Sequence, residues 1–249
     1  MSAPLFNALL ELADDHLILG HRVSEWCGHA PLLEEDLAMP NMALDMIGAA
    51  RSLYTYAGEI EGEGRDEDQL YLRYDRDYKN CLLVERPNED FAHTMLKQLY
   101  FVAYMHPYWE AALQSSDETV RGIAGKSVKE VAYHIRHAGE WVVRLGDGTE
   151  ESAQRMQDAV TELHPYVEEL FHMSADAQAA ADNGALPDRE AMRAQWTNTI
   201  SNVFDQAKLT MPEVEYPQVG GRTGHHGEEM GHLLSDLQYM QRAYPNMSW

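Results

Sequence analysis

Apolar residues recur with the spacing of α-helices along most of this 249-residue chain, and runs of strict alternation, which would indicate strands, are scarce. Seven segments carry the helical period. They span residues 3–27, 34–60, 88–113, 117–146, 149–173, 188–209 and 225–242, and short helices are expected in the Ala-rich stretch 175–185. The pattern therefore predicts an all-α protein.

Short polar residues and prolines mark the ends of several segments. Expected N-caps, whose side chains accept hydrogen bonds from the first free backbone N–H groups, are Asn88, Asp117, Thr149 and Asp188. Pro107 is expected to kink its helix, and Pro40 either to kink its helix or to mark the start, whereas segment 149–173 is expected to continue through Pro165.

The first four segments predict a helix bundle. Each is about 25 residues long, and their connections are short except for one crossover at residues 65–87. The segment 117–146 has the clearest bundle seam, with apolar residues in steps of three and four: Ala124, Val128, Val131, Ile135, Ala138, Val142 and Leu145. This layout is typical of a ferritin-like four-helix bundle, with additional C-terminal helices wrapping it, and residues 1–249 are expected to form one such domain.

The chain is strongly acidic, with 41 Asp and Glu against 19 Lys and Arg and a formal net charge of −22. Such a surface repels phosphate backbones and anionic lipids, so neither nucleic acid nor a membrane is an expected partner. No Lys or Arg precedes Arg22 and no apolar run is long enough to span a bilayer, so no leader or transmembrane segment is expected. Cys27 and Cys81 are predicted to be buried free thiols, which favours a reducing, cytoplasmic location.

A ferritin-like bundle with two irons takes a carboxylate from each of two helices and a Glu-x-x-His pair from each of the other two. Residues three apart share a helix face, so one helix can offer both ligands to one metal. In the second helix the best candidate pair is Asp45 with Gly48, and in the fourth it is Glu130 with Tyr133. Both lack the imidazole, so no metal-binding or catalytic residue is predicted.

Histidines do occur near these slots and in intact pairs elsewhere. Glu130, His134 and His137 share one face of the fourth helix, where a hydrogen-bonded polar cluster is the favoured interpretation and a bound metal the alternative. Two intact pairs lie outside the four long helices: Glu169 with His172, and Glu229 with His232. The alternative function is a self-sufficient diiron oxygenase or oxidase with an irregular ligand set drawn from Glu130, His134, Glu169, His172, Glu229 and His232.

Five stretches are more specific than any of these motifs. They are SEWCGHAPLLEEDLAMPNMALDMIGAAR at 24–51, LLVERPN at 82–88, KEVAYHIRH at 129–137, RLGDGT at 144–149 and LQYMQRAYP near the end. Together they resemble the family of C subunits of the phenylacetyl-CoA ring epoxidases of phenylacetate degradation, from the first helix to the last residue.

The resemblance implies a ferritin-like, non-catalytic subunit that pairs with a homologous catalytic A subunit and stabilises it. In that family the complex, with its other subunits, takes phenylacetyl-CoA, oxygen and electrons from an NADPH-dependent reductase and forms the ring epoxide. The diiron centre and most contacts to phenylacetyl-CoA then belong to the A subunit, and no cofactor is expected in this chain. A metal-free helical adaptor unrelated to oxygenation, which would bind no A-type partner, is a further alternative.

A face of the first two helices is the candidate surface for the A subunit, because stable pairs bury large areas. Its large side chains would be Trp26, Met39, Met42, Met46, Tyr54 and Tyr56, for which packing inside this chain is the alternative. Basic residues gather in the fourth helix, where an acidic partner or a substrate phosphate is the hypothesis: Arg121, Lys126, Lys129, Arg136 and Arg144.

Two segments are implied by the resemblance to lie against the CoA ester. They are Asp77, Tyr78, Lys79 and Asn80 in the crossover, and Gln178, Ala179 and Ala180 after the fifth helix. The chemistry is suitable, since the ammonium of Lys79 can meet a phosphate and the aromatic face of Tyr78 can meet adenine. A solvated loop is the alternative.

Overall fold

The computed structural model describes residues 2–245 and 247, and within them it contains helices, short 3-10 turns and loops but no strand. The α-helices are α1 (Ser2–Ser24), α2 (Leu33–Glu61), α3 (Glu67–Tyr71), α4 (Leu82–Glu85), α5 (Phe91–Ala112), α6 (Glu118–Gly146), α7 (Glu150–Leu163), α8 (Ala175–Asp182), α9 (Arg193–Ala207) and α10 (Glu228–Ala243). The prediction of an all-α protein is confirmed.

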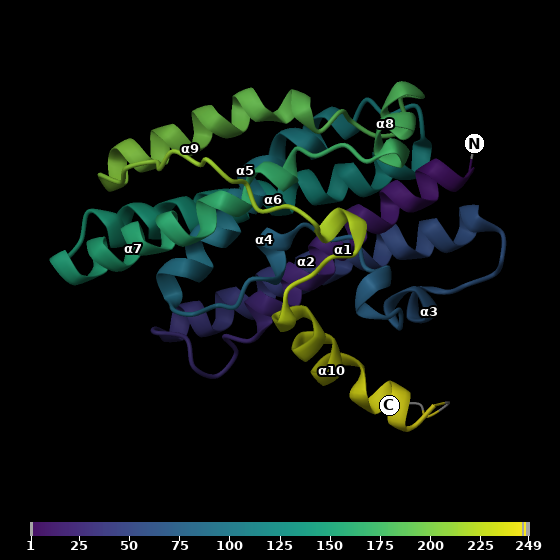
Figure 1. Cartoon of the computed structure of the whole chain (residues 1–249), viewed down its shortest axis with the longest axis horizontal. Helices are drawn as coiled ribbons and strands as arrows, with labels where there is room; N and C mark the ends of the chain where they lie inside the picture. The colour runs from purple at the N-terminus through teal and green to yellow at the C-terminus, as the bar shows by residue number, and fades with distance from the viewer. Residues whose placement is uncertain (1, 246, 248–249) are drawn as a thin grey trace.

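Helices α1, α2, α5 and α6 form the predicted four-helix bundle. Helix α1 packs along α2 and α5 along α6, while α2 also lies against α6. Helices α7 and α9 lie against α5 and α6, α8 packs on α1, and α10 projects away from the bundle in Figure 1. The crossover from α2 to α5 holds α3, a 3-10 turn at 75–77 and α4, and the whole arrangement is ferritin-like.

The core lies between the four long helices. Helix α5 is buried along nearly its whole length, as expected for a helix that is apolar on most of its sides. Helix α6 is buried on one stripe, and the predicted seam is confirmed there. Its members are either buried or packed against the core: Ala124, Val128, Val131, Ile135, Ala138, Val142 and Leu145.

Two of the four predicted N-caps, Asp117 and Thr149, are confirmed, and the other two, Asn88 and Asp188, are wrong. The side chain of Asp117 accepts a hydrogen bond from Val120 N, and that of Thr149 accepts one from Ser152 N. Helix α5 is capped by Asp90 rather than by Asn88. The amide of Asn88 instead donates to the carbonyl oxygen of Arg22 at 2.7 Å, which fixes the crossover to the end of α1.

One proline acts differently from the prediction. Helix α7 ends at Leu163 instead of near residue 173, and 3-10 turns at 164–166 and 168–170 follow. Pro165 explains this end, because proline has no N–H and its ring crowds the preceding turn. Helix α2 starts well before Pro40 and continues through it, and α5 continues through Pro107.

The other helix ends differ from the prediction by a few residues. Helix α1 ends at Ser24 instead of residue 27, α10 begins at Glu228 instead of residue 225, and α9 begins at Arg193 after a 3-10 turn at 190–192. The predicted cap Asp188 does accept a hydrogen bond, from Glu190 N at 2.9 Å, but the N-cap residues are Arg189 for this 3-10 turn and Met192 for α9.

The prediction that a face of the first two helices binds the A subunit is wrong for the residues named, because their side chains pack in or against this chain's own core. Met39, Met42, Met46 and Tyr54 are buried. The two remaining members, Trp26 and Tyr56, are half-buried against the core, where the first donates to Thr94 Oγ1 and the second to Asp117 Oδ2. The prediction of two buried thiols is also half wrong, since Cys81 is buried but Cys27 is exposed.

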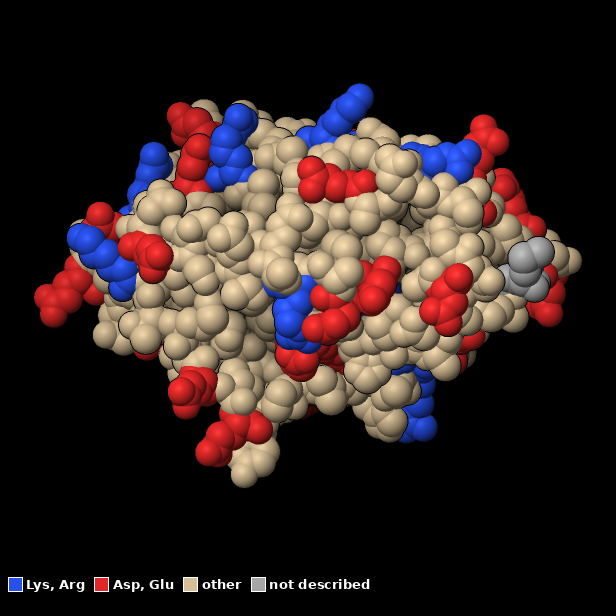
Figure 2. Space-filling view, turned by 90° about the horizontal axis from the view of Figure 1, so that it is seen from above, with Lys and Arg blue, Asp and Glu red and all other residues tan. Residues whose placement is uncertain are grey.

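The surface carries both signs of charge. Figure 2 shows carboxylates and basic groups interspersed over the face seen from above. None of the helices in the described part of the chain is both long and apolar enough to cross a membrane.

Candidate functional site

A small polar cluster lies at the centre of the four-helix bundle. It contains His16 from α1, Asp45 from α2, and Glu130 and His134 from α6, which line a gap of about 10 Å³. A space of this size holds one water molecule at most. Asp45 and Glu130, the carboxylates at the two candidate ligand positions of α2 and α6, therefore do lie close together in the bundle, but the gap between them is too small for two metal ions.

The histidines of α6 are each paired with a carboxylate of α2. His134 Nε2 lies 3.1 Å from Asp45 Oδ2, and His137 Nε2 lies 2.8 Å from Glu35 Oε2. Burial lowers the pKa of His134, against the opposing effect of its hydrogen bond to Asp45. The favoured interpretation, a hydrogen-bonded polar cluster, thus holds for both histidines.

Glu130, which shares a face of α6 with His134 and His137, has a different partner. Its carboxylate lies 3.5 Å from Lys126 Nζ on the preceding turn of α6. Burial raises the pKa of Glu130, and the nearby Asp45 carboxylate raises it further. Glu130 therefore pairs with the ammonium of Lys126 on its own helix and not with an imidazole.

His16 was not predicted as part of this cluster. Its Nδ1 lies 2.7 Å from the carbonyl oxygen of Leu12, so Nδ1 donates, and its Nε2 has no hydrogen-bond partner among the described residues. Burial lowers its pKa, and the ring packs edge-on against Phe101. The sequence signal is a histidine on the apolar face of a long helix. His16 therefore stays neutral at neutral pH, with an acceptor nitrogen inside the bundle.

This donor set does not fit two irons. A diiron bundle needs four carboxylates and two imidazoles placed by two Glu-x-x-His pairs. Gly48 has no side chain at the first imidazole position, and Tyr133 at the second is exposed on the outside of α6. Throughout residues 2–245 and 247, no three His, Cys, Asp or Glu side chains are grouped so that they could hold a metal ion.

The intact Glu-x-x-His pairs do not assemble with the bundle centre. The buried Glu169 carboxylate accepts hydrogen bonds from three backbone N–H groups, those of Leu82, Gly220 and Arg222, while His172 is exposed. In the second pair, His232 is exposed and pairs with Glu228, and Glu229 lies 3.8 Å from Arg86. The ligands of the alternative diiron interpretation therefore serve separate parts of the fold.

Two buried acids of α1 anchor the crossover. Asp14 accepts hydrogen bonds from the Tyr54 hydroxyl, the Arg73 guanidinium and Lys79 N. Its neighbour Asp15 accepts one from Cys81 N at 2.7 Å and pairs with Arg222. The sequence signal is two adjacent acids inside an apolar helix, since a buried carboxylate needs a partner.

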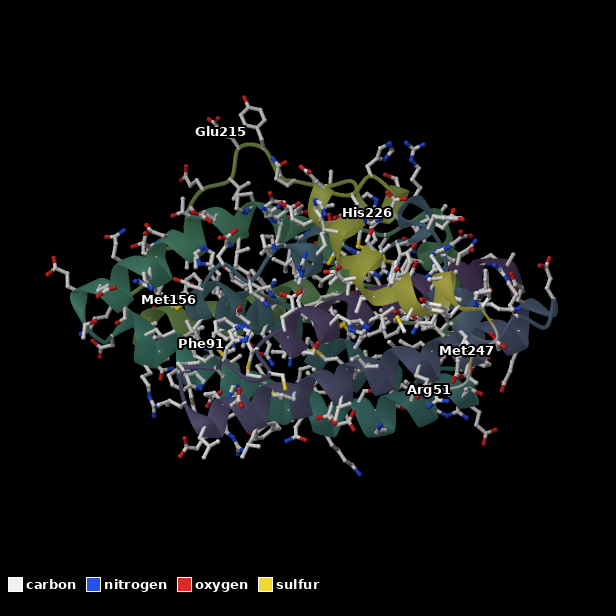
Figure 3. All side chains as sticks on the ribbon, turned by 90° about the horizontal axis from the view of Figure 1, so that it is seen from below. Arg51, Phe91, Met156, Glu215, His226 and Met247 are labelled. Atoms are coloured by element: carbon white, nitrogen blue, oxygen red, sulfur yellow. The ribbon has the colours of Figure 1, made fainter. Side chains whose placement is uncertain are left out.

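A third anchor joins the crossover to the start of α10. The carboxylate of Glu85 accepts from Asn80 Nδ2 at 3.0 Å, from Gly227 N at 2.7 Å and from His226 Nδ1 at 2.7 Å. Figure 3 shows His226 where α10 begins. Donors about 145 residues apart in the sequence, from Asn80 and from His226 and Gly227, are thus held at one buried carboxylate.

The predicted substrate segment 77–80 is only partly accessible. Asp77 is exposed and Lys79 half-exposed, with its Nζ 3.4 Å from the carbonyl oxygen of Arg76. Tyr78 and Asn80 are fully buried, and the Arg73 guanidinium lies over the Tyr78 ring at 4.4 Å. The contact expected between Tyr78 and adenine is therefore not available in this structure.

The second predicted substrate segment lies in α8. Gln178 is exposed and donates to Asp182, Ala179 is half-buried, and Ala180 is buried. Both substrate segments lie against α1, where Asp176 of α8 binds Asn7 and the crossover binds Asp14. Those two positions of α1 are about 10 Å apart along the helix axis, so the two segments contact neighbouring parts of the same helix.

Known proteins are similar to this chain along nearly its whole length. The family model described as Phenylacetic acid catabolic protein (PaaA_PaaC) matches residues 1–249. The C subunit of the 1,2-phenylacetyl-CoA epoxidase of Escherichia coli (strain K12) is 38% identical over 240 residues, which cover 96% of this chain and 97% of that protein.

Proposed function

Because the chain belongs to the phenylacetic acid catabolic protein family, we propose that it is the structural, non-catalytic subunit of a phenylacetyl-CoA epoxidase. In this role it binds and stabilises a catalytic A-type subunit in phenylacetate catabolism. The diiron centre lies in that A-type subunit, and electrons reach it from NADPH through a separate reductase.

The closed centre of the bundle is the observation that supports this proposal. Where a diiron protein of this layout has imidazole ligands, this chain has Gly48 and an outward-facing Tyr133. The carboxylate of Asp45 is bound to His134, and the remaining gap has room for about one water. A bundle built in this way can keep its shape and present its outer faces without taking part in oxygen chemistry.

Contacts to phenylacetyl-CoA are proposed to be secondary in this chain. Among the residues implied by the resemblance, those that reach the surface are Asp77, Lys79, Gln178 and, in part, Ala179. The ammonium of Lys79 is suited to a CoA phosphate, whereas Asp77 would repel one. Most of the ligand then lies against the partner subunit.

The test compares the chain expressed alone with the chain co-expressed with its A-type subunit, both in iron-rich medium. Iron per chain and epoxidation of phenylacetyl-CoA with the reductase are measured in each preparation. We expect almost no iron and no turnover from the chain alone. In the co-expressed complex we expect turnover and a higher melting temperature for the A-type subunit than it has by itself.

Two results would overturn the proposal. About two irons per chain in the protein expressed alone, as a diiron bundle would hold, would make it a metal-binding subunit. Failure of the A-type subunit to bind the chain would instead favour an adaptor with another partner.

A further inference from the structure

A row of leucines faces solvent along the outer side of α2. Leu33, Leu37 and Leu44 are 71%, 61% and 65% exposed. Steps of four and seven residues place them on one helix face, opposite the buried methionines of the same helix. Exposed apolar side chains that line up on one face indicate an interaction site, whereas isolated ones do not.

The neighbouring helix α6 extends this row with an aromatic residue and two cations. Tyr133 is 44% exposed, and it lies on α6 directly before His134 and about one turn before His137, the two histidines that contact α2. Lys129 and Arg136 precede and follow Tyr133 by four and three residues, so they flank it on the same face. The Arg136 guanidinium lies 5.5 Å from the centre of the Tyr133 ring.

These two cations have no carboxylate partner in the described part of the chain, although the chain is acidic. Some basic side chains on the long helices have carboxylate partners, such as Arg51 with Glu67 and Lys126 with Glu130, whereas Arg121 binds a backbone oxygen and Arg144 lies over the Trp141 ring. Lys129 and Arg136 form no ion pair with any residue that the structure describes. They are therefore available to carboxylates of another molecule.

We propose that this α2–α6 face binds the A-type subunit, an inference that rests on the proposed function. The face consists of Leu33, Leu37, Leu44, Lys129, Tyr133 and Arg136. It predicts a partner surface with an apolar helix ridge flanked by carboxylates. Each of the two helices has 29 residues and is about 43 Å long, which suits side-by-side packing with another helical bundle.

Charge argues against a second copy of this chain as the occupant. Two copies meeting through the same face would bring four cations into one interface. Each copy also carries a formal net charge of −22, so long-range repulsion opposes their approach. A different subunit with a complementary surface avoids both costs.

The test measures the affinity of the full-length chain for the A-type subunit. We expect Leu37→Glu combined with Leu44→Glu to weaken binding by at least about 30-fold, since both side chains would be central in the interface. Both are exposed, so the melting temperature of the free chain should not change. The matched control is Tyr216→Glu combined with Val219→Glu, which adds the same two charges at side chains that are 78% and 53% exposed in the loop between α9 and α10.

A second variant tests the charges. Lys129→Glu combined with Arg136→Glu should slow association about 10-fold at low salt and remove most of the salt dependence of the association rate. Arg155→Glu, which reverses one exposed charge on α7, should leave the rate unchanged.

The outcomes distinguish a failure of the proposed function from a failure of the proposed α2–α6 contact face. If the wild-type chain does not bind the A-type subunit, the proposed function fails and this inference fails with it. If the wild-type chain binds and both double variants bind equally well, the proposed function stands but the α2–α6 face is not the contact. A dimer of the free chain that the leucine variant dissociates would also overturn the inference.

Discussion

Arg222 holds Asp15 in a two-pronged ion pair that joins residues 207 positions apart. The Nη1–Oδ1 distance is 3.0 Å and the Nη2–Oδ2 distance is 2.7 Å, and both side chains are almost completely buried. Through this pair the segment before α10 is fixed to the middle of α1. The same guanidinium donates to the carbonyl oxygen of Lys79, so the crossover is held at the same point.

The first prediction is that Arg222→Met lowers the free energy of unfolding by about 3–5 kcal/mol. The variant leaves the Asp15 carboxylate buried without its countercharge, and this uncompensated charge is the main cost. Urea unfolding followed by circular dichroism measures the loss. Arg155→Met, at a pair whose arginine side chain is 58% exposed, should change stability by less than about 1 kcal/mol. Similar losses in the two variants would contradict this account.

Much of the bundle could be predicted because its signals are local. The seam of α6 and the cap at Asp117 follow from residues within one helix, and both are confirmed. The end of α7 was missed because the apolar pattern continues beyond Pro165. In the structure the chain instead forms 3-10 turns after Leu163, at Pro165 and at Glu169, whose carboxylate accepts a hydrogen bond from Leu82 N. The apolar pattern alone does not show whether the helix continues through the proline or ends before it.

The polar interior was harder to predict because its partners are far apart in sequence. The broken pair Asp45 and Gly48 could be recognised from helix spacing. That Glu169 would bind the backbone N–H groups of Leu82 and Gly220 could not, since nothing in the sequence near these residues indicates the contact. The orientation of α2 was missed for a related reason. One face of this helix carries methionines such as Met42 and the opposite face carries leucines such as Leu37, and the sequence does not show which face packs into the core.

The second prediction concerns two glycines of α6. A Cβ atom at Gly146 would lie 2.4 Å from the carbonyl oxygen of Ala207, where α6 meets the end of α9. Gly146→Ala should therefore destabilise the protein by about 1–3 kcal/mol through overpacking. At Gly122 a Cβ would meet no atom within 4 Å, so Gly122→Ala should stabilise by about 0.5–1 kcal/mol through helix propensity. Thermal unfolding of both variants tests the opposite signs, and a shift in the same direction would be inconsistent with this packing.

The third prediction is that the two thiols react at very different rates. Cys27 is exposed, whereas Cys81 is buried, and burial with the nearby Asp15 carboxylate raises the pKa of the Cys81 thiol. A thiol reagent should modify one cysteine rapidly in the native chain and the second only on unfolding. Mass spectrometry should find the fast label on Cys27, and Cys27→Ser should abolish the fast phase. Rapid labelling of Cys81 in the native protein would contradict its burial.

The last prediction concerns the pH dependence of stability at His226. Its Nδ1 lies 2.7 Å from Glu85 Oε2 and its Nε2 lies 3.0 Å from the carbonyl oxygen of Tyr78, so only the doubly protonated ring donates to both acceptors. Burial by itself lowers the pKa of His226, but the hydrogen bond and charge of Glu85 outweigh it and raise the pKa above the ordinary 6.5.

A raised pKa means that the folded chain binds this proton more tightly than the unfolded chain does. The stabilisation is therefore complete below about pH 6.5 and is lost as the pH rises through the higher folded value. His226→Gln should lower the free energy of unfolding most at about pH 6 and progressively less towards pH 8. Urea unfolding across this range measures the difference, with His232→Gln at an exposed histidine as the control that should not alter the profile. A loss at His226→Gln that is the same at every pH would show that the ring acts by packing alone.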